Sequence, residues 1–213
     1  MKKAIRIRVF NTVVFKAVVT STALAVFALP GIAQSADAAA PATSQSINQR
    51  KENQQDRIAN GVKSGELTAG ETTNLEKKES SLNQEERDMR KLDNGKLTST
   101  DKSTLNQQQN KLSNQIYDDK HNAAVQNTDP KSEVGKRAEN QQDRIAQGVK
   151  SGQLTAGETA HLESGESKIN KEVSNDRKAN GGKLTPEERK QVNRQQNRES
   201  RQIYRDKHNG RRQ

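Results

Sequence analysis

The sequence predicts an all-α protein built from two tandem copies of a three-helix unit, with helical hairpins, coiled-coil-like seams and a thin core. Three observations lead to this prediction: a glycine–threonine motif that occurs four times, an internal duplication with an offset of 87 residues, and a scarcity of large apolar side chains beyond the N-terminus. Together they favour slender helices over a sheet or a large globular core.

The glycine–threonine motif predicts where helices end and begin. It reads SGELTAGE at 64–71 and SGQLTAGE at 151–158, and more loosely GKLTSTD at 95–101 and GKLTPEE at 182–188. The glycine ends one helix, and the threonine with an acid three residues later begins the next as a capping box. The acid also suits the positive end of the helix dipole. The predicted helix-capping residues are Thr68 with Glu71, Thr98 with Asp101, Thr155 with Glu158, and Thr185 with Glu188.

The chain from residue 46 onward is a sequence unit written twice. Between residues 50 and 122, 44 of 73 positions match the residue 87 places later, which indicates duplication. The predicted helices are 47–62, 69–92 and 99–121 in the first copy, and 133–149, 156–178 and 186–208 in the second. The predicted organisation is a signal peptide (1–38), a disordered linker (39–45), helical repeat 1 (46–122), a linker (123–132), helical repeat 2 (133–209) and a basic tail (210–213).

The first 38 residues are typical of a secretory signal. Five basic residues without an acid precede an apolar run at 17–29, Pro30 and Gly31 break that run, and Ala36-Asp37-Ala38 supplies a small-x-small cleavage pattern. The alternative, an uncleaved membrane anchor, fits these flanks and this length less well. We therefore expect an exported protein, located in the bacterial periplasm or outside the cell.

The apolar content predicts narrow burying faces. From residue 39 onward there are 22 Leu, Ile, Val and Phe in 175 residues, a level that cannot fill a large core. In the second helix Leu75, Leu82 and Met89 recur every seven residues, and Glu79 and Glu86 lie between them. We expect marginal stability, completed by pairing of the two copies or by self-association of two chains.

The residue inventory offers no chemistry for catalysis. The chain has no cysteine, and the single Asp/His pairs at Asp119–His121 and Asp206–His208 offer too few ligands for zinc. Aligning Gly95 or its equivalents on a calcium-binding loop leaves most oxygen ligands absent. The low apolar content also predicts that no pocket raises the pKa of a carboxyl. We expect no enzyme, no cofactor, no metal site and no small-molecule substrate.

Basic residues are concentrated at the C-terminal end. Residues 177–213 hold 12 bases and 4 acids, whereas residues 39–176 hold 20 bases and 22 acids. On the last predicted helix, five bases fall within an arc of about 80°. This candidate anion-binding face consists of Lys190, Arg194, Arg198, Arg201 and Arg205. Such a row suits nucleic acid, lipopolysaccharide, acidic polysaccharide or an anionic membrane surface, and the equally weighted alternative is a solvated face that only maintains solubility.

The duplicated motifs carry a resemblance. The phrases ENQQDRIAQGVKSGQLTAGETA and GGKLTPEERKQVNRQQNRESRQIYRDKHN, in tandem arrangement, resemble a group of exported bacterial proteins of uncharacterised function that are built from this repeat. The resemblance covers nearly all of residues 46–210. It implies a bacterial, exported, all-helical protein, and it implies no activity, cofactor or catalytic residue.

Three functional hypotheses follow. The first is an exported, non-catalytic helical repeat protein that acts by surface contact in the cell envelope. The second is an electrostatic binder of anionic polymers through the basic C-terminal helix. The third is that the Gln- and Asn-rich helices fold only on meeting a partner.

Overall fold

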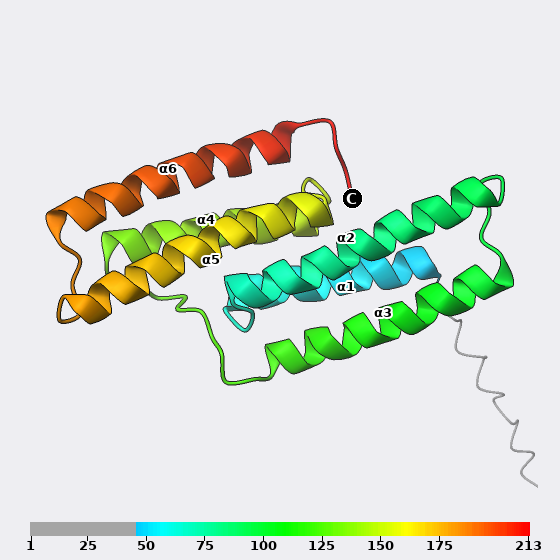
Figure 1. Ribbon diagram of the computed structural model, residues 1–213, viewed down its shortest axis with the longest axis horizontal. Helices are drawn as coiled ribbons and strands as arrows, with labels where there is room; N and C mark the ends of the chain where they lie inside the picture. The colour runs from blue at the N-terminus through cyan, green and yellow to red at the C-terminus, as the bar shows by residue number, and fades with distance from the viewer. Residues whose placement is uncertain (1–45) are drawn as a thin grey trace, which may run out of the picture. The chain divides into compact units, whose positions relative to one another are not determined.

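A computed structural model describes residues 46–213, and within this range it contains six α-helices and no strand (Figure 1). The all-α prediction is therefore confirmed, and every predicted helix boundary lies within two residues of the observed one. The predicted signal peptide (1–38) and N-terminal linker (39–45) lie outside the described residues. The helices are α1 (Ile47–Ser64), α2 (Ala69–Leu92), α3 (Ser99–Lys120), α4 (Glu133–Lys150), α5 (Ala156–Ala179) and α6 (Pro186–His208).

Reciprocal capping bonds begin most of these helices. At the start of α2 the Glu71 N–H donates to Thr68 Oγ1 at 3.3 Å, and the Thr68 N–H donates to Glu71 Oε2 at 2.9 Å. The same capping box begins α3, α5 and α6, each from the threonine and acid of its glycine–threonine motif. The helix before α2 ends at Gly65, whose φ of 75° lies in the left-handed region that favours glycine.

A capping threonine can be tested by substitution. We expect Thr155→Ala to lower the free energy of unfolding by about 1 kcal/mol, because the Glu158 N–H loses its acceptor at the start of α5. The melting temperature should fall by about 2–4 °C. Thr100→Ala, an exposed position in the first turn of α3 that is not a cap, is the control. An equal loss in both variants would show that the cap contributes nothing specific.

The two halves of the described chain, residues 46–122 and 133–209, share their cores. Helix α2 packs against α5 and α1 packs against α4, while α3 covers α1 and α2, and α6 covers α4 and α5 (Figure 1). One apolar cluster contains Ile58, Leu75 and Leu112 of the N-terminal half together with Ala146 of the C-terminal half. The equivalent cluster of the C-terminal half contains Ala59. Each half therefore places one alanine in the core of the other.

Buried polar side chains supplement the thin apolar core. The Gln54 amide donates to the Gln109 carbonyl at 2.7 Å and ties α1 to α3, while Gln109 donates to the Ile47 carbonyl at 2.9 Å. Arg57 donates to Ser113 Oγ at 2.6 Å and to the Ser113 carbonyl at 3.1 Å. The same bonds recur 87 residues later, from Gln141, Gln196 and Arg144. These bonds satisfy buried backbone carbonyls, and they connect the helices where large apolar side chains are few.

Within residues 46–213, every helix is either too short or too polar to cross a membrane.

Candidate anion-binding face

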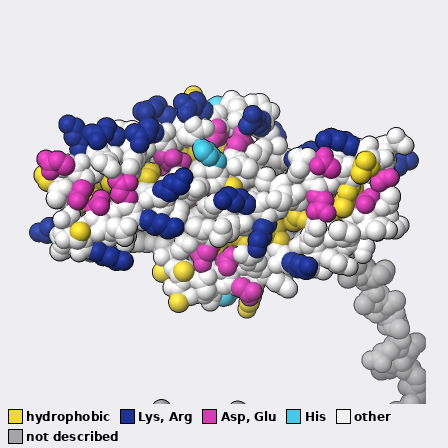
Figure 2. Space-filling model, in the orientation of Figure 1, with side chains coloured by type: hydrophobic (Ala, Val, Ile, Leu, Met, Phe, Trp, Pro, Cys, Tyr) yellow, Lys and Arg dark blue, Asp and Glu magenta, His cyan; other side chains and the backbone are white. Residues whose placement is uncertain are grey.

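Five basic side chains form a row on the solvent side of α6, and we call Lys190, Arg194, Arg198, Arg201 and Arg205 the basic row. All five are exposed. The opposite side of α6 carries Val192, Gln196 and Ile203, which are fully buried against the rest of the C-terminal half. Spacings of three and four residues place the two sets on opposite sides of the helix. Figure 2 shows Lys and Arg side chains gathered along the edge of the molecule that α6 forms.

The basic row keeps its charge available to a ligand. Five ion pairs occur among residues 46–213, and none of them includes a member of the row. Arg205 donates a hydrogen bond to Gln202, which is uncharged. The positive charges of the row are therefore not neutralised by neighbouring carboxylates.

The same face of α3 is exposed but nearly neutral. The residues 87 places before the basic row carry one base and one acid, so their net charge is zero where the row has +5. All of them are exposed. They are Ser103, Gln107, Lys111, Asn114 and Asp118. The charge of the row is therefore not required by the helix itself, since α3 forms the same kind of helix without it.

Two acids on α6 have pKa values that are shifted in opposite directions. Burial raises the pKa of Glu199 to about 7, and the nearby Asp206 acts in the same direction. The Glu199 carboxylate lies against Gly165 of α5, where a Cβ atom would come within 2.6 Å of Glu199 Oε2. Glu188 is engaged in the N-terminal cap, where the Thr185 N–H lowers the pKa of its carboxyl. As pH falls through neutrality, Glu199 gains a proton and α6 becomes more positive.

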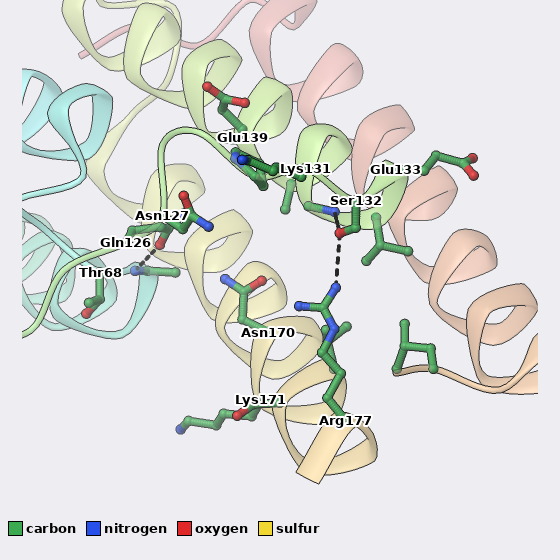
Figure 3. Close-up of a pocket in the computed structure, with 18 of the residues that line it drawn as sticks. Thr68, Gln126, Asn127, Lys131, Ser132, Glu133, Glu139, Asn170, Lys171 and Arg177 are labelled. Carbon is green, nitrogen blue, oxygen red and sulfur yellow. Dashed lines mark hydrogen bonds between the residues drawn. The ribbon is translucent and has the colours of Figure 1, made fainter. Parts of the chain in front are cut away.

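An open groove of about 1520 Å³ is lined in part by Arg189 of α6, but by no member of the basic row. It lies between the start of α2, the linker that joins α3 to α4, the first turns of α4, the second half of α5 and the α5–α6 turn. Figure 3 shows Arg177 reaching from α5 to Ser132, whose hydroxyl accepts its hydrogen bond at 3.0 Å. Arg189, the residue before Lys190, also lines the groove. The charged lining residues are Lys131, Lys171, Arg177, Lys178, Lys183 and Arg189, with Asp129, Glu133 and Glu139.

The lining of the groove is net positive, since it carries six bases and three acids. The sequence predicted residues 123–132 only as a linker. It could not predict the groove, because the wall opposite the linker comes from α5, some forty residues later in the chain.

The sequence predicted that no apolar pocket would raise the pKa of a carboxyl, and it did not predict the burial of carboxyls between helices. Burial raises the pKa of Glu79 to about 7 and that of Glu163 to about 8, and it raises the pKa of Glu76 and Glu166 well above the ordinary value. The cause is a contact between helices and not a pocket. The seven-residue spacing had placed Glu79 on the burying face, and that spacing was the available signal.

Two of the histidines stack on tyrosines. The His121 ring lies 4.1 Å from that of Tyr117, and the His208 ring lies 4.2 Å from that of Tyr204. Each ring Nδ1 is 2.7 Å from the carbonyl of its tyrosine. Among residues 46–213, no three His, Asp or Glu side chains are grouped so that they could hold a metal ion.

Comparison of the chain with protein-family models, curated proteins and solved structures gives no match.

Proposed function

We propose that this chain is an exported, non-catalytic helical repeat protein that acts by surface contact in the cell envelope, and that its contact surface is the basic row of α6. The ligands are anionic polymers: nucleic acid, lipopolysaccharide or acidic polysaccharide. The observation that carries the proposal is the alignment of five exposed bases outside every ion pair of residues 46–213. Aligned, unneutralised charge attracts an opposite array and raises its rate of association.

The dimensions of the row suit a polymer better than a small anion. From residue 190 to residue 205 the helix rises about 22 Å, and each arginine can offer a two-pronged donor to a phosphate, sulfate or carboxylate. Tyr204 is the exposed aromatic side chain beside the row, and it already stacks on His208. Recognition by stacking on several bases therefore has little support here, and we expect binding to be sequence-independent.

The tandem architecture and export belong to the same proposal. Recurrence of identical buried bonds 87 residues apart, such as those of Arg57 and Arg144, supports two copies of one three-helix unit. Export is supported by the signal pattern at 1–38 of the sequence. Surface contact in the envelope would then bring the basic row to the anionic polymers of that compartment.

The experiment exchanges the basic row for the residues of the matching face of α3. We expect the full-length chain to bind heparin and double-stranded DNA at low salt, with log K falling steeply as log salt rises. The five-fold variant should bind at least about 100-fold more weakly at low salt, because each base near an anionic array contributes on the order of 1 kcal/mol. The substitutions are Lys190→Ser, Arg194→Gln, Arg198→Lys, Arg201→Asn and Arg205→Asp.

A matched control removes the same net charge from exposed positions in the N-terminal half. It should bind nearly as well as the unchanged chain, because those bases are scattered over several helix faces. Circular dichroism should show equal helical content in all three proteins. Equal loss of binding in both variants, or no binding by the unchanged chain at low salt, would refute the proposal. The control substitutions to glutamine are at Lys63, Lys77, Lys91, Lys96 and Lys111.

A further inference from the structure

Four buried glutamates lie on the two helices that join the halves of the chain, and we call them the carboxyl cluster. Glu76 and Glu79 belong to α2, and Glu163 and Glu166 occupy the equivalent positions of α5. Their exposed fractions are 0% for Glu76, 1% for Glu79, 0% for Glu163 and 0% for Glu166. Helix α2 packs against α5 (Figure 1), and Glu163 of α5 lies close enough to Glu76 of α2 to raise its pKa, so these two carboxyls are neighbours across the two halves.

Hydrogen bonding in the cluster is half complete. The Gln55 amide of α1 donates to Glu76 Oε2 at 3.1 Å, and the Gln142 amide of α4 donates to Glu163 Oε2 at 2.9 Å. In both pairs the glutamine Oε1 and the glutamate Oε1 are buried without a partner. Both oxygens of Glu166 are also without one. Buried unpaired acceptors are costly, so each Gln–Glu pair lacks a donor.

A proton on the glutamate would supply that donor. An ionised carboxylate only accepts hydrogen bonds, whereas a carboxylic acid has an O–H that can donate to an amide oxygen. A protonated Glu76 could therefore donate to Gln55 Oε1 while it accepts from Gln55 Nε2, and Glu163 could do the same with Gln142. Both Gln–Glu pairs, which lie 87 residues apart in the sequence, therefore need a proton to complete their hydrogen bonds.

The charges around the cluster also favour the neutral acids. Burial raises the pKa of all four carboxyls, and for Glu76 the neighbouring Glu79 and Glu163 act in the same direction. From α6, Glu199 raises the pKa of Glu163 and Glu166. The opposing charge is Lys51 of α1, which acts on Glu79 and also lies 4.0 Å from Glu86 of α2. Within residues 46–213, no charge from α3 or α4 contributes to these shifts.

We propose that the carboxyl cluster is a proton-dependent clasp: as neutral acids its glutamates leave the contact between α2 and α5 uncharged, and their ionisation as pH rises places like charges on both helices and loosens the junction between the two halves. At acidic pH the junction is closed. At alkaline pH it carries up to four buried negative charges on two facing helices, and the halves separate more readily.

The direction of the pH dependence follows from proton binding. The ordinary pKa of a glutamate is 4.5, and the folded-state pKa values of Glu79 and Glu163 are about 7 and about 8. Between pH 4.5 and about 8 the folded chain holds more protons than the unfolded chain, so the free energy of unfolding falls as pH rises. The stabilisation that these groups contribute is fully present below pH 4.5, and it is lost as pH rises through their folded-state pKa values.

The test is the melting temperature of the full-length chain between about pH 5 and pH 8.5, with and without the double substitution Glu76→Gln and Glu163→Gln. A glutamine can donate and accept as the protonated acid does. We expect the unchanged chain to lose roughly 5–10 °C over this range, and the double variant to lose about half as much or less. At pH 8.5 the variant should be the more stable protein. Glu52→Gln, an exposed position on α1, is the control and should leave the pH dependence unchanged.

A second measurement covers the case in which the double variant does not fold. Infrared spectra of the unchanged chain at about pH 6 should show the C=O band of protonated carboxyl groups, and that band should weaken as pH rises through about 7 and about 8. Two results would overturn the proposal: a melting temperature that stays level or rises between pH 5 and 8.5, or absence of the protonated band at pH 6. An unchanged pH dependence in a folded double variant would overturn it as well.

Discussion

Replacing Ala146 with aspartate is expected to destabilise the whole protein by about 3–5 kcal/mol. Ala146 is only 3% exposed and lies in the apolar cluster of Ile58 and Leu75, in the opposite half of the chain. A carboxylate there would exchange water for the apolar side chains of this cluster. Because two halves contribute to this cluster, the substitution in α4 should destabilise α1 and α2 as strongly as its own half.

Hydrogen exchange followed by mass spectrometry measures this loss separately for each half. We expect faster exchange in α1, α2 and α4 together, alongside a lower midpoint of urea unfolding. Asn140→Asp, on the exposed face of the same helix, is the control and should change the midpoint little. Faster exchange limited to α4 and α5 would contradict a shared core.

Replacing Leu75 with alanine is expected to cost about 2–5 kcal/mol and to lower the melting temperature by roughly 5–15 °C. Leu75 is 0% exposed and packs with Leu112 and Ile116 of α3. Few large apolar side chains are available to close the cavity that the substitution leaves. The lost contacts therefore have no substitute, and the cost should lie in the upper part of that range.

The control for Leu75→Ala is Leu82→Ala, seven residues later on the same helix face. Leu82 is only partly buried against the same cluster, so its truncation should cost less than about 1.5 kcal/mol. Urea unfolding followed by circular dichroism gives both values under the same conditions. Similar losses in the two variants would mean that burial at the cluster centre does not dominate the stability of the chain.

Helix positions could be predicted from the sequence because their signals are local. A glycine that adopts a left-handed conformation and a threonine with an acid three residues later act within a single turn. For this reason the predicted start of α2 and that of α5 coincide with the observed starts at Ala69 and Ala156. The exposed side of α6 could be predicted for a similar reason, since helical periodicity alone places the basic row opposite Val192 and Ile203.

The seven-residue spacing indicated the burial of Glu79, but the burial of Gln54 and Glu76 could not be predicted, because it depends on partners distant in the chain. The buried Gln54 amide donates to the carbonyl of Gln109, 55 residues later in the chain. The buried Glu76 carboxyl accepts from the amide of Gln55, 21 residues earlier. A glutamate in a helix normally faces water. The burial of Glu76 depends on the packing of both α1 and α5 against α2, since Gln55 and Glu163 are its neighbours.

The exchange of Ala59 and Ala146 between the two cores also bears on assembly. The surface by which one half packs against the other half of its own chain fits the same half of a second molecule equally well. The linker between the halves favours pairing within one chain over pairing between two chains. A short linker gives the partner half an effective concentration on the order of millimolar. Domain-swapped dimers, in which the halves of two chains are exchanged, are therefore the natural alternative state when the clasp opens at high protein concentration.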